Sequence, residues 1–169
     1  MHPEELQRTI DNYRTKGIIV DANLLLLYFV GRYDPHLIEK FKRTSHYTLD
    51  DFDLLANILS CFSFIVTTPN VLTEVSNLSG HLPEAARSAY FEEFRKQILV
   101  LEEKYVPSRV VCEKEHFERV GLSDSVIADL SENKHLVLTD DVGLAVLLEN
   151  QGIDVINFAH VRRLRWMAS

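Results

Sequence analysis

Acidic side chains follow two of the apolar, strand-like runs in this sequence. Asp21 comes directly after the run at 17–20, and Asp140 and Asp141 come directly after the run at 136–139. A carboxylate next to a hydrophobic core costs free energy unless a positive charge compensates it, and several carboxylates brought together repel one another. Divalent cations such as Mg²⁺ bind oxygen ligands and relieve that repulsion. The pattern therefore favours hydrolysis assisted by a metal ion.

Two further acids lie in predicted helices that can reach the same place. Glu74 lies at the border of the apolar face of a helix expected over 69–79. Asp124 lies in the first turn of a helix expected over 123–133, for which Ser123 is suited as the N-cap. In an open parallel sheet, ligands bind outside the carboxyl ends of the strands, where the strand order reverses. All of these acids can converge at that point.

Short runs rich in valine and isoleucine alternate with helical patterns along the chain. Buried parallel strands have this composition, and their alternation with helices is typical of α/β folds. We therefore expect a three-layer α/β sandwich with a central parallel sheet. The expected strands are 17–20, 64–67, 109–112, 136–139 and 154–158, and the expected helices are 3–15, 23–31, 34–43, 50–61, 69–79, 83–104, 123–133, 141–151 and 159–166.

The composition is that of one globular domain. The chain has 169 residues, of which 46% are hydrophobic, so we expect a single domain over 1–169. It includes an N-terminal helix at about 3–15 and an extended helical region at about 32–62. The longest apolar run, 24–30, is too short to span a bilayer, no secretory signal pattern begins the chain, and two cysteines make no disulfide framework. We expect a cytoplasmic protein with reduced thiols and no membrane partner.

The net charge of −7 does not favour a nucleic-acid partner, which prefers a basic surface. Part of this negative charge can belong to acidic side chains of the metal site, where bound cations would offset it. The local basic clusters are 40–43, 95–96 and 162–165. The first interpretation of each cluster is a helix face exposed to solvent. Arg162, Arg163 and Arg165, next to Trp166, are the candidate RNA-binding rim, because arginine and an aromatic ring can both contact single-stranded bases. They could equally pack on the first helix or on the second subunit of a homodimer.

Four motifs, in this order, resemble those of the PIN-domain nucleases. They are Ile-Val-Asp21-Ala-Asn23-Leu-Leu, Thr68-Pro-Asn-Val-Leu-Thr-Glu74, Gly121-Leu-Ser-Asp124-Ser and Leu-Thr139-Asp140-Asp141. The resemblance covers the chain from about residue 17 to about residue 158. It implies a five-stranded parallel sheet in the order 3-2-1-4-5, with an acidic pocket that binds Mg²⁺ or Mn²⁺ and cuts single-stranded or structured RNA.

The resemblance also assigns roles by position. The matching residues are Asp21, Glu74, Asp124 and Asp141 for the catalytic acids and metal ligands, and Asn23, Thr139 and Asp140 for supporting positions that orient the acids or the water. The implied reaction is hydrolysis of an RNA phosphodiester bond by in-line attack of water. It leaves 3′-hydroxyl and 5′-phosphate ends and needs no covalent nucleophile.

Alternatives to a ribonuclease stay open. The chain could be a catalytically silent PIN-like scaffold or an RNA-binding module. A phosphoaspartyl phosphatase or response receiver is a further class, although Asn23 stands where such a phosphatase carries its second aspartate. For a nuclease, two biological roles are compatible with the sequence: the toxin of a toxin–antitoxin pair, with an antitoxin or other protein partner, and an RNA-processing enzyme.

Overall fold

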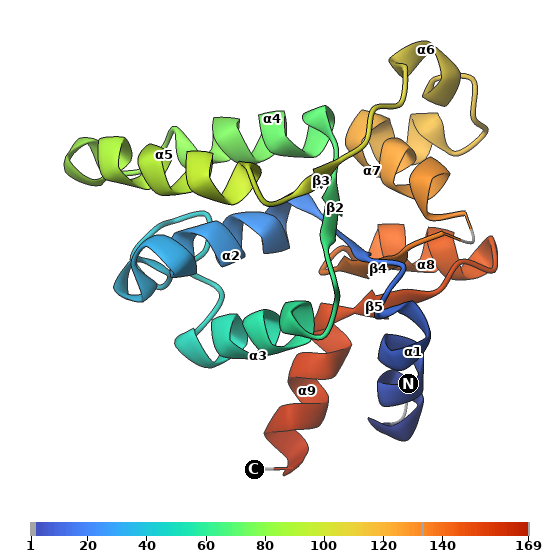
Figure 1. The fold of residues 1–169 in the computed structure, drawn as a ribbon, viewed down its shortest axis with the longest axis horizontal. Coiled ribbons are helices and arrows are strands. Elements are labelled where there is room, and N and C mark those ends of the chain that lie inside the picture. The colour runs from blue at the N-terminus through green and yellow to red at the C-terminus, as the bar shows by residue number, and fades with distance from the viewer. Residues whose placement is uncertain (1–2, 133, 169) are drawn as a thin grey trace.

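A five-stranded parallel sheet forms the centre of the protein in a computed structural model, which describes residues 3–132 and 134–168 (Figure 1). The strand order is β3-β2-β1-β4-β5, and all four neighbouring pairs are parallel. This confirms the expected α/β fold and strand order. The strands are β1 (Ile18–Val20), β2 (Ile65–Thr67), β3 (Glu102–Glu103), β4 (Leu136–Thr139) and β5 (Val155–Asn157).

Helices lie on both sides of these strands (Figure 1). In that view α4, α5 and α7 lie above the strands, and α3 and α9 lie below them. Among the described helices, none has the length and apolar surface needed to cross a bilayer. The α-helices are α1 (Pro3–Tyr13), α2 (Ala22–Tyr33), α3 (Leu49–Ser60), α4 (Pro69–Ser79), α5 (Glu84–Ile98), α6 (Ser108–Val111), α7 (Phe117–Ser131), α8 (Val142–Asn150) and α9 (Phe158–Ala168), and the 3₁₀ helix is η1 (Pro35–Leu37).

The third strand differs from the prediction. We expected it at 109–112, but that segment forms the short helix α6, which follows Pro107 and buries Val111. The strand is instead formed by two glutamates, 102 and 103, paired with Val66 and Thr67 at the sheet edge. Edge strands tolerate charged residues because one side of the strand faces solvent. As a consequence α5 ends at Ile98, short of the expected 104.

The helix expected at 34–43 is also wrong. Only the 3₁₀ helix η1 forms there, and turns lead from it to α3. Asp34 ends α2 and its side chain caps η1, while the hydroxyl of Thr44 donates to the carbonyl of Ile38 at 2.8 Å. Polar side chains that bond to nearby backbone compete with helical hydrogen bonds, which accounts for the turns.

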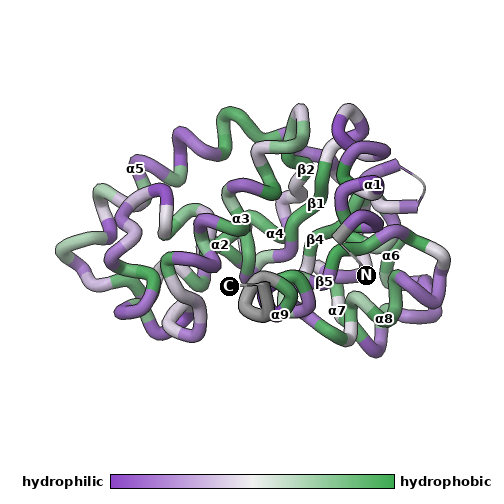
Figure 2. Tube along the Cα trace, turned by 90° about the horizontal axis from the view of Figure 1, so that it is seen from below, coloured by the Kyte–Doolittle hydropathy of each residue, from purple (hydrophilic) through white to green (hydrophobic). Residues whose placement is uncertain are grey.

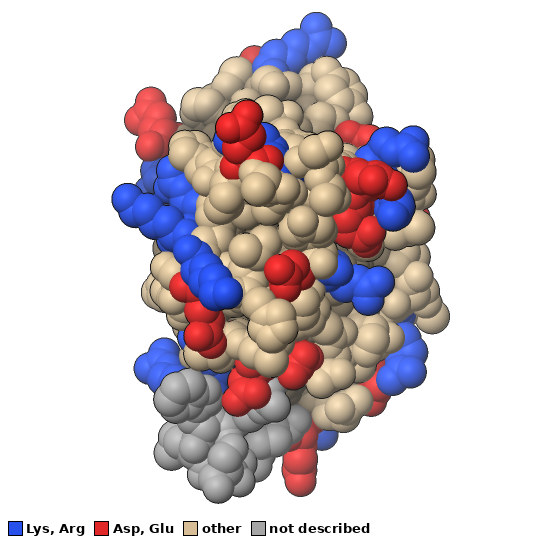
Figure 3. Space-filling view, turned by 90° about the vertical axis from the view of Figure 1, so that its left-hand side faces the viewer, with Lys and Arg blue, Asp and Glu red and all other residues tan. Residues whose placement is uncertain are grey.

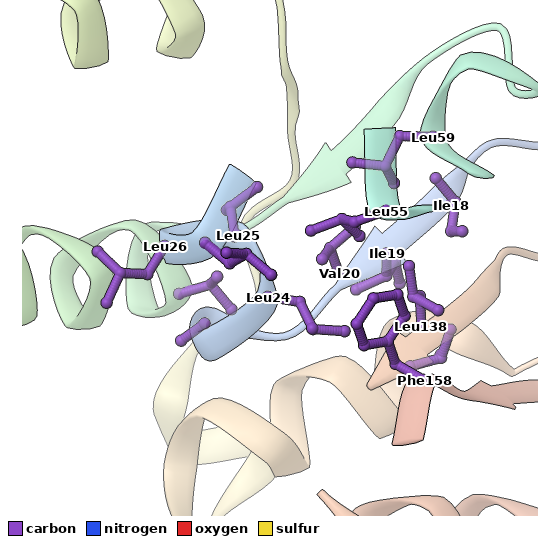
Figure 4. Close-up of a cluster of buried hydrophobic side chains, with 14 of the residues drawn as sticks. Ile18, Ile19, Val20, Leu24, Leu25, Leu26, Leu55, Leu59, Leu138 and Phe158 are labelled. Atoms are coloured by element: carbon purple, nitrogen blue, oxygen red, sulfur yellow. The ribbon is translucent and has the colours of Figure 1, made fainter. Parts of the chain in front are cut away.

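The hydrophobic core gathers around β1 and α2 (Figure 4). All three residues of β1 have no exposed surface, and Leu24–Leu27 of α2 are at most 1% exposed. Hydrophobic segments accordingly run through the interior of the trace (Figure 2). Gly31 lets α3 approach α2, because a Cβ atom there would lie 2.3 Å from the ring of Phe52. Most residues of α2 are buried, and this helix begins directly after Asp21.

Helix α7 changes direction at Gly121. This residue has φ 78° and ψ −172°, a backbone conformation that favours glycine, and helical geometry resumes after it. Ser123 therefore lies inside the resumed helix and is not its N-cap, which corrects the expected helix start. Asp124 is still within the first turn after the break, so the turn at Gly121 determines the direction in which its side chain leaves the helix.

Candidate functional site

Asp21 and Asp140 lie side by side because β1 and β4 are neighbours in the sheet. Asp21 is 4% exposed and caps α2, with Oδ1 accepting a hydrogen bond from the backbone N–H of Leu24 at 2.8 Å. Its Oδ2 accepts from the hydroxyl of Thr139 at 2.5 Å and from the backbone N–H of Asp140 at 2.7 Å. Burial raises the pKa of Asp21, while these three hydrogen bonds act in the opposite direction. The carboxylate is therefore held in one orientation.

Asp124 lies in the electric field of the other three expected acids. Its pKa is raised to about 7, first by burial and then by the charges of Asp141, Asp21 and Glu74. No ion pair among the described residues joins a cation to any of the four. The fold thus brings Asp124 within electrostatic range of each of the other three acids. By contrast Asp129, on the same helix, is paired with Lys114 at 3.0 Å.

A cavity of about 560 Å³ has two of these acids in its wall. Asp124 comes from α7, and Asp141 caps α8 by accepting the backbone N–H of Leu144 at 2.9 Å. Arg119 lines the same cavity from the first part of α7, and its guanidinium has no hydrogen bond or ion pair with another described residue. A cavity with both acidic groups and an unpaired arginine can hold a cation and an anionic group together.

Glu74 and Asn23 occupy the periphery. Glu74 is exposed on α4 and lines a neighbouring cavity of about 430 Å³. Asn23 is exposed in the first turn of α2, and its side chain makes no hydrogen bond with another described residue. Within residues 3–132 and 134–168, no three side chains of the kinds that ligate metals lie close enough together to hold one ion.

The donor chemistry of this site nevertheless fits a hard divalent cation. All the candidate ligands are carboxylate oxygens, the pKa of Asp124 is raised by burial and by the other acids, and none of the four makes an ion pair with a described cation. Mg²⁺ is commonly held by one or two carboxylates and keeps several waters, so it does not need a closed set of three protein ligands. Asp124 and Asp141, which share a cavity, are the pair that would hold it, with Asp21 and Glu74 contributing their charge.

Asp140 has a partner that the sequence analysis missed. The hydroxyl of Tyr47 donates to Oδ2 of Asp140 at 2.8 Å, while Oδ1 is buried with no hydrogen-bond partner. Burial, together with the charge of Asp140, raises the pKa of Tyr47 above its usual value, so the hydroxyl remains a donor. Thr139 contacts two of the acids. Its hydroxyl donates to Asp21, and its oxygen accepts the backbone N–H of Asp141 at 2.9 Å.

The basic residues near the C-terminus, the expected RNA-binding rim, differ in their surroundings, and Arg162 is paired within the protein. Arg162 makes a bidentate ion pair with Asp51, with N–O distances of 2.8 and 2.7 Å. Its positive charge is therefore compensated within the protein. Arg163 is exposed, and the side chain of Arg165 lies outside the described part of the structure. On the side of the molecule that carries α5 and α2, basic and acidic side chains are interspersed (Figure 3).

Sequence comparisons neither add to nor restrict this interpretation. No protein-family model matches the chain, and no curated protein matches it.

Proposed function

We propose that this protein is a metal-dependent ribonuclease that hydrolyses RNA phosphodiester bonds. The observation that carries the proposal is the place of Asp124 and Asp141 in the wall of one cavity, where the pKa of Asp124 is raised first by burial and then by the charges of Asp141, Asp21 and Glu74. Such an arrangement destabilises the folded protein unless it serves a ligand of opposite charge. Strained electrostatics of this kind are more common at functional sites than elsewhere.

Each residue has a part in this reaction. Asp124 and Asp141 would hold a divalent cation, and Asp21, fixed by its three hydrogen bonds, would add its negative charge from the buried side of the site. When bound, Mg²⁺ or Mn²⁺ lowers the pKa of a bound water and offsets the charge that builds on the scissile phosphate. Arg119 contacts a phosphate oxygen of the substrate, because an unpaired guanidinium in an otherwise acidic cavity provides directed donors.

RNA cleavage in Mg²⁺ or Mn²⁺ tests the proposal. We expect a labelled single-stranded RNA to be cut by the purified chain, with 5′-phosphate ends on the products, and we expect EDTA to abolish cutting. Asp124→Asn and Asp141→Asn should lose activity while remaining folded. These two changes test the proposal better than Asp21→Asn, because an amide at Asp21 would direct a donor at the N–H of Asp140.

The matched control is Asp129→Asn, which changes the same residue type on the same helix outside the cavity. It should leave cleavage unchanged. Cleavage that persists in EDTA would exclude the metal, and cleavage that survives in both cavity variants would exclude the site. A chain that binds RNA but cuts none under any of these conditions would support the alternative of a silent PIN-like RNA-binding module.

A further inference from the structure

A second cavity lies next to the acidic cavity and differs from it in chemistry. It has a volume of about 430 Å³, within the range typical of ligand sites, and is formed by α4, Tyr105, Ser108 and the start of the resumed part of α7. Glu74 is in its wall, and Ser123 in the same wall directly precedes Asp124. Anything bound there therefore lies beside the proposed cleavage site.

The cavity wall carries neutral polar side chains with unused hydrogen-bonding capacity. Asn70, Thr73 and Asn77 project from α4, and Ser108 and Ser123 from the opposite wall. None of these five side chains makes a hydrogen bond with another side chain or backbone group in the described part of the chain. Asparagine amides both donate and accept, which is the combination that base edges require.

Tyr105 adds an aromatic ring to this polar wall. Its exposed fraction is 76%, so it contributes nothing to the core. Among the described residues, no other ring packs against it and no group hydrogen-bonds to its hydroxyl. An exposed ring with free faces in the lining of this cavity is suited to stack on a planar group.

The charge of the wall disfavours an anionic ligand. Among the described residues, no lysine or arginine lines this cavity, and its charged residue is Glu74, which would repel a phosphate. Arg119 instead lines the acidic cavity with Asp124 and Asp141. The acidic cavity therefore has the arginine and the candidate metal ligands that suit a phosphate. The second cavity has the neutral polar groups and the aromatic ring that suit a base.

We propose that the cavity of Asn70, Asn77 and Tyr105 binds a nucleobase of single-stranded RNA, while the adjoining phosphate lies at the acidic cavity. The inference rests on the proposed function, since it places the base next to the cleaved bond. A flipped-out base stacks on Tyr105, and its edge hydrogen-bonds with the two asparagine amides. Paired bases cannot enter, because their faces and edges are already occupied, so the site selects unpaired RNA.

The test measures binding separately from cleavage. A short fluorescein-labelled single-stranded RNA is titrated, by anisotropy in Mg²⁺, with the Asp124→Asn protein and with the same protein carrying a second change. We expect Tyr105→Ala to weaken binding by about tenfold, since base stacking is worth about 1–3 kcal/mol. We expect Asn77→Ala to weaken it by about fivefold, since one hydrogen bond is worth about 1 kcal/mol. Tyr105→Phe, which keeps the ring, should retain the affinity. Leu99→Ala, which changes a side chain 75% exposed and outside the cavity, should have no effect.

An RNA probe with abasic nucleotides keeps the phosphates and removes the bases. It should bind more weakly to the starting protein, and Tyr105→Ala should then cause no further loss. The proposal is overturned if Tyr105→Ala and Asn77→Ala leave binding unchanged, if Leu99→Ala weakens it equally, if the abasic probe binds as well as the intact one, or if no RNA binds.

The outcomes also separate this subsite from the nuclease proposal. Binding of RNA that depends on Tyr105, in a protein whose wild-type form cuts no RNA, supports the subsite and contradicts the nuclease. Metal-dependent cutting of RNA by the wild-type chain, with the KM unchanged by Tyr105→Ala and Asn77→Ala, supports the nuclease and contradicts the subsite.

Discussion

The hydroxyl of Tyr47 donates a hydrogen bond to Oδ2 of Asp140, 93 residues further along the chain. Asp140 in turn donates its backbone N–H to Oδ2 of Asp21. Tyr47 is 1% exposed, and the guanidinium of Arg162 lies 5.2 Å from the centre of its ring. The turns that precede α3 are therefore connected, through two hydrogen bonds, to the buried acid of the candidate site.

Replacing Tyr47 with phenylalanine should destabilise the protein. The change removes the donor and leaves both oxygens of Asp140 without a partner, because Oδ1 already has none. An orphaned buried polar group costs about 1–3 kcal/mol, so the free energy of unfolding should fall by that amount in urea denaturation. Tyr28→Phe is the control, because the hydroxyl of Tyr28 has no hydrogen-bond partner in the described structure. Equal stability of the two variants would mean that the contact with Asp140 is not formed.

The sequence predicted Asp21, Asp140 and the supporting Thr139 in one place, but not every residue that contacts them. Asp21 and Asp140 could be placed together because each follows a buried run, and the carboxyl ends of neighbouring parallel strands lie at one edge. Tyr47 could not be found in this way, since it lies among turns with no periodic pattern and its partner is far along the chain. The ion pair of Arg162 with Asp51 could not be predicted either, because a basic cluster in the sequence does not show which acid is its partner.

The strand at the sheet edge escaped prediction for a different reason. Valines at 110 and 111 favour a strand, but Pro107 and the packing of Val111 in a small cluster with Val106 and Val126 place them in α6. The two glutamates of β3 have little intrinsic preference for a strand. Their pairing with β2 decides the outcome, and tertiary pairing of this kind is not visible in local sequence.

Asp124→Asn should stabilise the protein, and the gain should grow with pH. The folded-state pKa of Asp124 is about 7, above its unfolded value of 3.8, so the folded state holds this proton more tightly. Stability from this group is then greatest below the unfolded value and is lost as the pH rises to about 7. Asparagine does not titrate, so its advantage in Tm should increase between about pH 4 and about pH 7 and then level off.

The control for this measurement is Asp129→Asn. That change removes the partner of Lys114 instead of relieving repulsion, so it should lower Tm slightly at neutral pH. A gain for Asp124→Asn that is the same at all pH values would show that the carboxyl group of Asp124 titrates normally.

Divalent cations should raise the Tm of the wild-type chain. A cation that binds the folded state stabilises it by mass action, by about 2.7 kcal/mol at one hundred times its Kd. We expect the shift with Mg²⁺ or Mn²⁺ to be largest above about pH 7, where Asp124 is charged, and to shrink in Asp124→Asn and Asp141→Asn. Asp129→Asn should keep the full shift. Scanning fluorimetry with and without the metal measures this without any RNA, and equal shifts in all three variants would exclude the cavity as the binding site.

Arg119→Ala should weaken RNA binding without unfolding the protein. The guanidinium is exposed and unpaired, so its removal should leave Tm within about 1 °C of the wild type. A charge-assisted hydrogen bond to phosphate is worth about 1.5–3 kcal/mol, so KM should rise about tenfold or more. The slope of log affinity against log salt should fall by about 1.

The control is Arg109→Ala, at an exposed arginine outside the acidic cavity, which should change neither the KM nor the salt slope. Equal effects of the two changes would indicate general electrostatic attraction instead of a specific contact.

Arg162→Ala distinguishes a structural arginine from an RNA-binding one. Arg162 is paired with Asp51, whose side chain is 2% exposed and also accepts the backbone N–H of Thr48 at the start of α3. Removing one partner of a buried pair leaves the other charge uncompensated, so we expect the free energy of unfolding to fall by about 3–5 kcal/mol in urea. The affinity of the remaining folded protein for RNA should stay unchanged.

The control is Arg163→Ala, one position further on and exposed, which should alter the free energy of unfolding by less than about 0.5 kcal/mol. A variant at Arg162 that is fully stable yet binds RNA more weakly would restore this arginine to the RNA-binding rim.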